Sequence, residues 1–254
     1  MSTATQIKLR SFCWIDLPTD KPEVAAKFYT ALFGWEAREV MNNDKGNYSM
    51  FFKDGHDVGG FYRLEGRPTW WASYVLVEDV DAMVKKAGEL SGKVYMPVTE
   101  VMPGARMAVV ADPTGAALAL WESKDGSKTL RDVPNTLCWN ELLTHDTQKS
   151  GDFYTQLLGW TTKSDGPGGA GYTEFLNDGV SIAGMMAFPP DSGQMPPFWM
   201  PYFMVEDVDA MAARAKELGG KAMIEGLDVE GVGRIANIMD PVGGGFGMVQ
   251  FAAQ

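Results

Sequence analysis

The chain has 254 residues, of which 45% are hydrophobic and 22% charged, and its net charge is −11. This composition is typical of a globular protein with room for two domains of about 100–150 residues. The negative charge argues against nucleic acid or an anionic membrane as a partner, because both bind basic surfaces. The chain has no run of about 20 apolar residues and no apolar signal core near its start, so we expect a cytoplasmic protein.

The first elements predict a βαβββ unit. Residues 11–18 alternate in polarity and predict a strand. Residues 24–33 place apolar side chains every three or four positions, which indicates an amphipathic helix. We expect Thr19 or Asp20 to cap this helix and Gly34 to end it. Three short strands are then expected near residues 35–41, 47–53 and 58–64.

A second βαβββ unit follows within the same domain. Residues 71–77 predict its first strand, and Asp79 is the expected N-cap of the next helix. Asp112 begins the sequence Asp-Pro-Thr-Gly, which is typical of a type I turn. The remaining strands are expected near residues 93–98, 106–111 and 116–122.

The whole pattern is then repeated. Residues 13–17 (Cys-Trp-Ile-Asp-Leu) return as residues 138–142 (Cys-Trp-Asn-Glu-Leu), which is 138 − 13 = 125 positions later. A period of this length is a domain, because solenoid repeats are only about 20–50 residues long. We therefore predict an α+β fold of two tandem domains, residues 8–123 and 135–254, joined by a charged, turn-rich linker at residues 124–134.

The two cysteines, Cys13 and Cys138, occupy equivalent positions of the repeat. A lone cysteine on a strand usually behaves as a small buried hydrophobe. Because we expect a reducing compartment and find no companion cysteine motif, we predict neither a disulfide nor a catalytic thiol.

The repeated motifs resemble the vicinal oxygen chelate superfamily, which includes glyoxalase I, bleomycin resistance proteins and extradiol dioxygenases. The matching motifs in each half are Phe-Tyr followed by Leu-Phe-Gly-Trp or Leu-Leu-Gly-Trp, then Val-Glu-Asp-Val-Asp at a helix start, and Asp-Pro-x-Gly before the last strand. The resemblance implies that each pair of βαβββ units forms a curled mixed sheet around a cavity. It leaves open whether each domain closes its own cavity or the two domains share them.

The resemblance also implies where a metal would bind. Metal-dependent members hold one divalent ion with His, Glu or Gln at three strand positions. The equivalent positions of this chain are Trp14, Ala72 and Ala119 in the first domain and Trp139, Met200 and Gly247 in the second. None of these side chains offers the imidazole nitrogen, carboxylate oxygen or thiolate sulfur that such ions require. We therefore predict that the protein uses neither a metal nor another cofactor.

Strand parity selects the candidate cavity residues. Side chains two positions apart share a face, so Asp16 accompanies Trp14 and Glu141 accompanies Trp139. The same parity adds further candidate ligand-binding residues, namely Tyr74, Trp121, Tyr202, Met200 and Gly247. Because pockets are mainly apolar and aromatic with a few polar groups, this face is a plausible small-molecule site.

The two acids on this face have two possible roles. An inward-facing carboxylate must be paired or functional, because an unpaired buried charge is costly. Asp16 and Glu141 could each bond to backbone or to an arginine such as Arg106 or Arg234. They could instead be carboxylates of raised pKa that act as catalytic bases or bind a ligand hydroxyl or amine.

Two further expectations concern the last strand of each domain. Glu122 and Gln250 have the opposite parity and should point away from the cavity. Gly245 and Gly247 stand where the first domain has Ala117 and Ala119, so we expect the last strand of the second domain to line the larger cavity.

These observations favour a metal-free protein, monomeric or homodimeric, that binds a small, partly apolar or aromatic molecule in a cavity lined by tryptophan and carboxylate. The alternative is a glyoxalase- or dioxygenase-type enzyme, with lyase, isomerase or hydroxylase chemistry, that uses Asp16 or Glu141 as a base or has a non-standard metal site. A third possibility is a scaffold whose cavities are filled by its own side chains.

Overall fold

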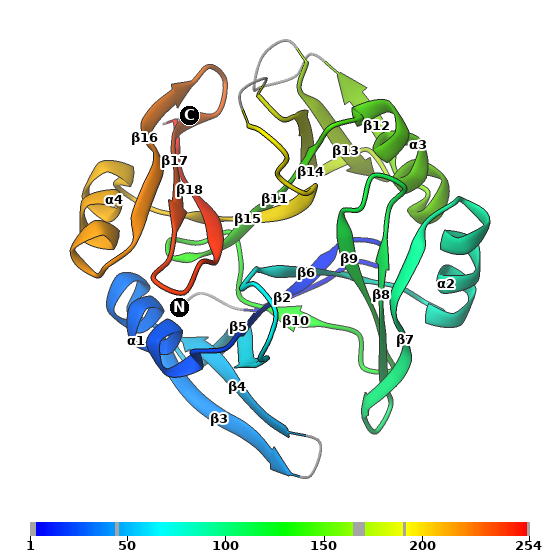
Figure 1. Cartoon of the computed structure of the whole chain (residues 1–254), viewed down its shortest axis with the longest axis horizontal. Helices are drawn as coiled ribbons and strands as arrows, with labels where there is room; N and C mark the ends of the chain where they lie inside the picture. Colours follow the sequence, from blue (N-terminus) through cyan, green and yellow to red (C-terminus); the bar gives the residue numbers. More distant parts are fainter. Residues whose placement is uncertain (1–3, 44–45, 165–170, 190–191, 253–254) are drawn as a thin grey trace.

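The computed structural model describes residues 4–43, 46–164, 171–189 and 192–252. The two halves of the chain each form an eight-stranded mixed sheet with two helices, which confirms the predicted tandem α+β fold (Figure 1). Within the described residues, no helix combines the length and apolar character needed to cross a membrane.

All strands of the first sheet come from the first domain. They are β2 (Phe12–Thr19), β3 (Glu36–Asn43), β4 (Gly46–Lys53), β5 (His56–Arg63), β6 (Ala72–Leu76), β7 (Lys93–Met102), β8 (Ala105–Ala111) and β9 (Ala117–Ser123). Their order is β3-β4-β5-β2-β6-β9-β8-β7. The pairs β2–β5 and β6–β9 are parallel, and the other pairs are antiparallel.

The second sheet repeats this order with strands of the second domain only. They are β11 (Thr136–Thr144), β12 (Thr161–Ser164), β13 (Thr173–Asn177), β14 (Val180–Ala187), β15 (Phe198–Met204), β16 (Lys221–Val229), β17 (Gly233–Met239) and β18 (Gly245–Phe251). Their order is β12-β13-β14-β11-β15-β18-β17-β16. Each concave face therefore belongs to a single domain.

The four helices are α1 (Pro22–Phe33), α2 (Val80–Glu89), α3 (Thr147–Leu158) and α4 (Val208–Glu217). Asp79 caps α2 as predicted, because its carboxylate accepts the backbone N–H of Ala82 at 3.0 Å. The expected cap of α1 by Thr19 or Asp20 is wrong. This helix has Lys21 at the N-cap without a side-chain bond, and Pro22 at its first position supplies a φ angle suited to a helix start.

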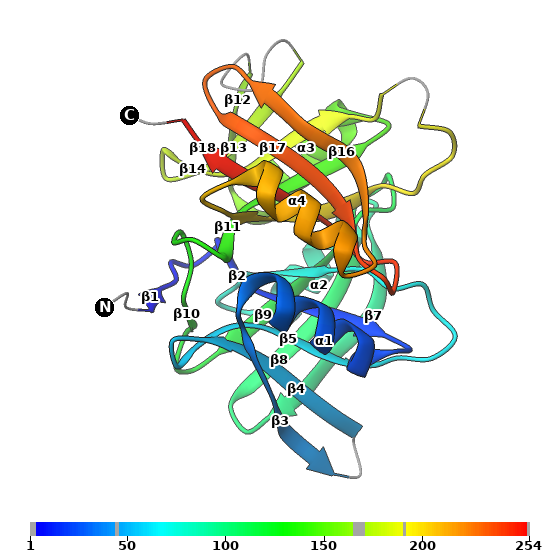
Figure 2. The ribbon, with the colours of Figure 1, turned by 90° about the vertical axis from the view of Figure 1, so that its left-hand side faces the viewer.

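The helices lie between the two sheets. Helix α1 runs beside α4 and α2 runs beside α3, so each side of the molecule carries one helix from each domain (Figures 1 and 2). Phe33 of α1 packs 5.0 Å from Phe203 of β15, measured between ring centroids. Phe12 of β2 likewise packs 5.1 Å from Trp199 of β15. The convex faces thus share the interdomain core, and the concave faces are turned away from it.

Polar bonds also join the domains through this core. The buried Tyr29 hydroxyl of α1 donates to Asp240 Oδ2 at 2.7 Å. Residues 124–134 connect the domains and contain a short strand, β10 (Lys128–Thr129), which pairs with β1 (Thr5–Gln6). Leu130 in the same segment is fully buried, so the connection is packed against the protein.

Candidate functional site

The concave face of each domain carries the side chains that strand parity selects. Ile15 and Leu17 of β2 pack into the interdomain core, whereas Trp14 packs with a separate cluster around Tyr74. Because side chains alternate along a strand, Asp16 lies on the face of Trp14. In β11, Trp139 packs in the corresponding cluster around Tyr202.

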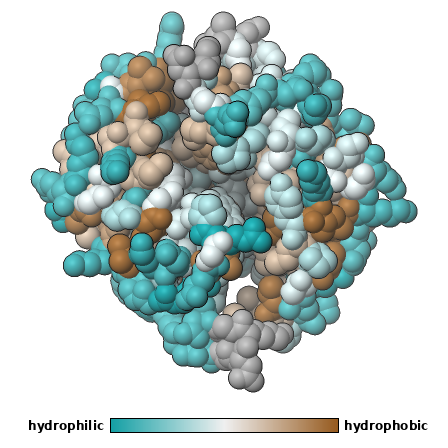
Figure 3. Space-filling model, viewed as in Figure 1, coloured by the Kyte–Doolittle hydropathy of each residue, from teal (hydrophilic) through white to brown (hydrophobic). Residues whose placement is uncertain are grey.

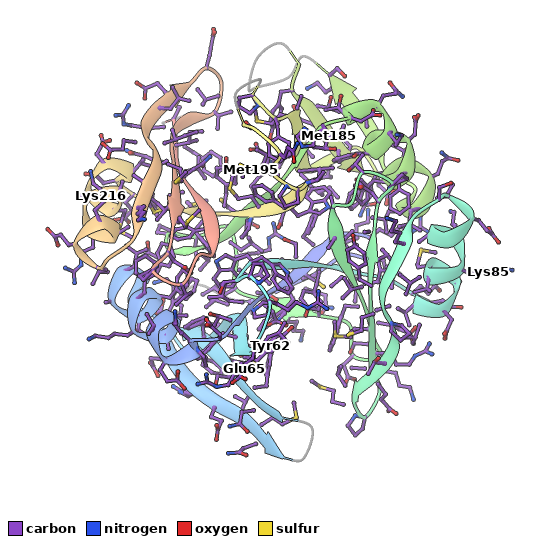
Figure 4. The ribbon with its side chains drawn as sticks, in the orientation of Figure 1. Tyr62, Glu65, Lys85, Met185, Met195 and Lys216 are labelled. Carbon is purple, nitrogen blue, oxygen red and sulfur yellow. The ribbon has the colours of Figure 1, made fainter. Side chains whose placement is uncertain are left out.

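In the first domain, three donors surround a buried carboxylate. Asp16 is 5% exposed. Its Oδ1 accepts the Tyr48 hydroxyl at 2.6 Å and the Trp14 indole N–H at 2.9 Å, and its Oδ2 accepts the Tyr74 hydroxyl at 2.7 Å. Tyr62 of β5 lies next to this group, with its ring centroid 6.2 Å from that of Tyr48 (Figure 4).

The second domain repeats the arrangement with longer bonds. Glu141 is 8% exposed. Its Oε2 accepts the Tyr172 hydroxyl and its Oε1 accepts the Tyr202 hydroxyl, each at 3.1 Å. The Trp139 indole N–H donates to the Tyr172 hydroxyl at 3.0 Å. Both domains therefore hold a carboxylate–tyrosine–indole cluster, and Glu141 is held less tightly than Asp16.

Burial raises the pKa of both carboxyl groups. Desolvation is the largest influence on Asp16 and Glu141, and the tyrosine hydrogen bonds oppose it only in part. The phenols that donate to these groups also have a raised pKa, first through burial and then through the neighbouring carboxylate. Burial thus opposes ionisation of the acids and of the phenols, whereas the hydrogen bonds from the phenols favour the ionised form of each acid.

The expectation that Arg106 or Arg234 could pair with Asp16 or Glu141 is wrong. Arg106 bonds to Glu122 and Asp81, and Arg234 bonds to Asp209 and Asp228. These arginines lie on the outer side of their sheets, beside the helix starts. Asp16 and Glu141 accept hydrogen bonds from tyrosine hydroxyl groups, and Asp16 also accepts one from an indole N–H.

Glu122 and Gln250 point away from the concave faces, in agreement with their parity. Glu122 Oε2 accepts the backbone N–H of Val80 at 2.9 Å, at the start of α2. Gln250 Oε1 accepts the backbone N–H of Val208 at 3.2 Å, at the start of α4.

Sequence reasoning missed Tyr48 and Tyr172, and also the glycines that make room for them. A Cβ on Gly60 would lie 2.0 Å from the Tyr48 hydroxyl oxygen, and a Cβ on Gly184 would lie 1.7 Å from that of Tyr172. The repeat contained a signal for both pairs, because 172 − 48 = 124 and 184 − 60 = 124. Comparing the polar positions of the two halves would have revealed them.

The remaining candidates lie at the edge of the clusters. Trp121 packs against Tyr74 with their ring centroids 6.5 Å apart. Met200 is 5% exposed and pairs in register with Glu141 across β11 and β15. Met200 therefore supplies apolar surface beside Glu141, and Trp121 supplies it beside the tyrosine that donates to Asp16.

Gly247 does not itself widen the second cavity, and the expectation that its strand lines the larger cavity stays a prediction. A Cβ on Gly247 would lie 2.2 Å from two carbons of the Tyr202 ring. The space that the missing side chain leaves is therefore filled by Tyr202, which reaches across it toward Glu141.

The side chains present at the family's metal positions do not fit a divalent ion. Trp14, Ala72 and Ala119 offer no suitable donor, and the second domain contributes only the thioether of Met200. Among the residues that the structure describes, no three His, Cys, Asp or Glu side chains gather as a metal-binding group. His145 lies at the surface with its Nε2 2.8 Å from the carbonyl oxygen of Met195, which is labelled in Figure 4.

The molecular surface has a mainly hydrophilic rim and a hollow near the centre of the face shown in Figure 3. Two surface pockets lie away from the clusters. One, of about 430 Å³, lies between the domains and is lined partly by Pro113 and Phe153. The other, of about 540 Å³, lies beside Arg234 and Phe251 at the end of the second sheet. Neither is lined by Trp14 or Trp139.

Two curled βαβββ sheets with paired helices define the class of this protein, and the comparison of sequences agrees. The model of the Glyoxalase/Bleomycin resistance protein/Dioxygenase superfamily matches residues 11–120 and 136–246. The chain belongs to this superfamily, as its repeated motifs predict.

Two groups of relatives match almost the whole chain. "Putative glyoxylase CFP32" of Mycobacterium tuberculosis is 37% identical over 249 residues, which is 95% of each chain. "Anthracycline biosynthesis protein DnrV" of Streptomyces peucetius is 33% identical and covers 93% of this chain and 92% of its own.

Solved structures share the fold at lower sequence identity. The Mn(II)-bound glyoxalase from Novosphingobium aromaticivorans superposes with a TM-score of 0.65 at 17% identity, covering 99% of this chain and 85% of that one. The 2,2',3-trihydroxybiphenyl 1,2-dioxygenase of Sphingomonas wittichii strain RW1 gives a TM-score of 0.64 at 14% identity, covering 97% and 93%.

Proposed function

We propose that the protein binds a small, partly apolar or aromatic molecule at the carboxylate–tyrosine–indole clusters, without the metal ion of its metal-dependent relatives. The observation that carries this proposal is the repetition of the cluster in both domains, at positions adjoining those where relatives hold the metal. In each domain a Trp replaces the first-strand ligand, and an acid follows two residues later.

The energetic cost of these clusters supports a binding role. Removing a carboxylate from water is unfavourable, and each cluster needs a glycine on the neighbouring strand to accommodate its tyrosine. An inert core would be more stable with apolar side chains at these positions. Trp14, Trp139, Tyr48 and Tyr172 are only partly buried, so their rings offer aromatic contact surface to a ligand.

The names of the relatives agree with this ligand class in one respect. Anthracyclines are polycyclic aromatic compounds, and the Streptomyces relatives are named for anthracycline biosynthesis. The mycobacterial relatives are named as a glyoxylase instead, so the names alone do not separate a binding protein from an enzyme.

An enzyme of the glyoxalase or dioxygenase type is the second candidate function, and the environment of Glu141 favours it. Burial raises the pKa of this carboxyl group, which makes it a stronger base than an exposed glutamate. Its two hydrogen bonds, at 3.1 Å, are also long enough to be exchanged for bonds to a substrate.

The test of binding uses the eight tryptophans of the chain. With 2-naphthol as the first probe, we expect saturable shifts of the Trp139 or Trp14 indole N–H signals in NMR spectra. Each signal is assigned by a Trp→Phe variant, and the exposed Trp70 is the control. Shifts confined to Trp70, across a panel of aromatic compounds, would refute the proposal.

Glu141→Gln separates the two candidate functions. For a binding protein, we expect this variant to weaken affinity and to leave the fold intact. For an enzyme with Glu141 as its base, turnover of a substrate should fall by about 100-fold or more while binding persists. Near-UV circular dichroism of the variant checks that the aromatic core is unchanged.

A further inference from the structure

Four buried side-chain atoms lack a hydrogen-bond partner within the described residues. Asp112 Oδ2 and Asn140 Nδ2 belong to residues at the interface between the domains, where Asn140 accepts a bond from Ser73 of the other domain. Glu174 Oε1 and Asn237 Oδ1 are different, because they belong to the concave face of the second domain. A buried acceptor without a hydrogen bond is unfavourable, so a donor that reaches either atom would be bound favourably.

Glu174 lies in the same cross-strand row as Glu141. Glu141 pairs in register with Gly184, and Gly184 pairs in register with Glu174 on the next strand. Paired residues point to the same side of a sheet, so both carboxylates stand on the concave face with a glycine between them. The Tyr172 hydroxyl lies over that glycine.

Asn237 lies in the neighbouring row. Trp139 pairs with Tyr202, Tyr202 with Gly247, and Gly247 with Asn237. The pKa of Tyr202 is raised first by burial and then by Glu141, and the Asn237 side chain is close enough to oppose that rise. Asn237 therefore borders the same cluster as Glu141, on the side opposite Glu174.

The first domain has the same two rows without these two groups. Met50 pairs with Gly60 and Gly60 with Asp16, so Met50 holds the place of Glu174. Val109 pairs with Ala119, so it holds the place of Asn237. The carboxylate of the first domain is already saturated by three donors at 2.6–2.9 Å. Both oxygens of Asp16 therefore have donors, whereas among the described residues the second cluster contains two buried acceptor atoms without a donor, Glu174 Oε1 and Asn237 Oδ1.

The charges of the second cluster select the kind of donor. Glu141 receives its hydrogen bonds from two phenols, which are neutral. Glu174 Oε2 accepts the Ser181 hydroxyl, and Lys163, itself 60% exposed, stands 3.9 Å from Glu174 Oε1. The Glu174 side chain is only 12% exposed, but 3.9 Å is beyond hydrogen-bond distance, so Lys163 leaves the bonding capacity of Glu174 Oε1 unused. Two carboxylates among the rings of Trp139, Tyr172 and Tyr202 form a site suited to a cation, since aromatic faces attract positive charge.

We infer that the second domain holds the working site, and that its ligand is an organic cation: a protonated amine on an apolar or aromatic frame, bound by Glu141, Glu174 and Asn237. This inference rests on the proposed binding function and makes it specific. The first cluster is then a structural copy of this site, with its carboxylate already bonded to Trp14, Tyr48 and Tyr74.

The experiment compares two probes of the same shape. Benzylamine is protonated at pH 7, whereas benzyl alcohol is neutral. We expect benzylamine to shift the Trp139 indole N–H signal and to leave that of Trp14 unchanged, and benzyl alcohol to bind at least about tenfold more weakly. Glu174→Gln should weaken benzylamine binding by about tenfold. Glu206→Gln, the same change at an exposed acid outside the site, should not.

The other outcomes overturn the inference in distinguishable ways. Equal binding of benzyl alcohol and benzylamine at Trp139 would exclude the cation and leave aromatic binding intact. A shift of Trp14 alone would exclude the second domain as the working site and leave the proposed function standing. If neither indole responds to these probes, to 2-naphthol or to the wider aromatic panel, the proposed function itself fails.

Discussion

The Tyr172 hydroxyl occupies the place that a side chain at position 184 would fill. A Cβ added to Gly184 would lie 1.7 Å from this oxygen, far inside any permitted contact. The absence of a side chain on β14 therefore allows a phenol from the preceding strand region to reach Glu141 on β11. The site depends on this glycine as much as on its polar groups.

Gly184→Ala should consequently expel Tyr172 from the cluster. We expect a loss of about 1–3 kcal/mol in the free energy of unfolding, because Glu141 loses a donor while it stays buried. Urea unfolding measures the change, and the Trp139 indole N–H signal should shift as its acceptor leaves. Gly245→Ala is the matched control, since that position has open space and the first domain already has Ala117 there. Equal stability of the two variants would contradict the prediction.

The interdomain core offers a second matched pair of substitutions. Tyr29 donates to the buried Asp240 at 2.7 Å, whereas its counterpart Tyr154 lies near Asp112 but makes its hydrogen bond, at 3.4 Å, to the carbonyl oxygen of Ala116. Hydrogen bonds to charged groups are the stronger ones, at about 1.5–3 kcal/mol. Tyr29→Phe should therefore destabilise the protein more than Tyr154→Phe in urea unfolding. The reverse order would show that Asp240 finds another donor.

The pH dependence of stability should reveal the buried acid of the second domain. Burial raises the pKa of Glu141 in the folded protein, so the folded state holds the proton more firmly than the unfolded chain. The resulting stability is complete below the unfolded pKa of about 4.3 and is lost as pH rises through the folded pKa. Relative to Glu141→Gln, the parent protein should lose stability from about pH 4 upward.

Urea unfolding at a series of pH values measures this difference. Because other acids titrate in both proteins, only the difference between parent and variant reports on Glu141. Glu206→Gln, at an exposed acid, serves as the control and should follow the parent curve. Parallel curves for the parent and Glu141→Gln would mean that Glu141 titrates alike in the folded and unfolded states.

Metal removal should leave the protein unaffected. The positions that hold the ion in metal-dependent relatives contain indole, methyl, thioether and hydrogen side chains, which are poor ligands for hard or borderline divalent ions. We expect a chelator to leave Tm unchanged and elemental analysis of the untagged protein to find less than stoichiometric metal. One firmly bound ion per domain would refute this, and Asp16 and Glu141 would then be the first ligands to replace.

Local patterns were sufficient to predict most of the fold. The 125-residue repeat, the helix periodicity and the strand alternation are properties of neighbouring residues, and they placed Trp14, Asp16, Trp139 and Glu141 on one face. The start of α1 was mispredicted because Pro22, rather than a capping side chain, initiates it.

The partners of the two acids required the tertiary structure. Tyr48 is 32 residues from Asp16 in the chain, and Tyr172 is 31 residues from Glu141, so no local pattern links them. The filling of the space beside Gly247 required it for the same reason, because the Tyr202 ring that fills this space comes from another strand.

The sequence by itself determined that the chain is a duplicated domain with an aromatic and acidic face, because repeats and strand parity depend only on the order of residues. Only the tertiary structure decided what that face can do. Strand pairing sets Glu174 and Asn237 beside Glu141 and sets Met50 and Val109 beside Asp16. Hydrogen-bond saturation is a property of atoms brought together across strands, so the difference between a closed cluster and one with free acceptors arises only in the folded chain.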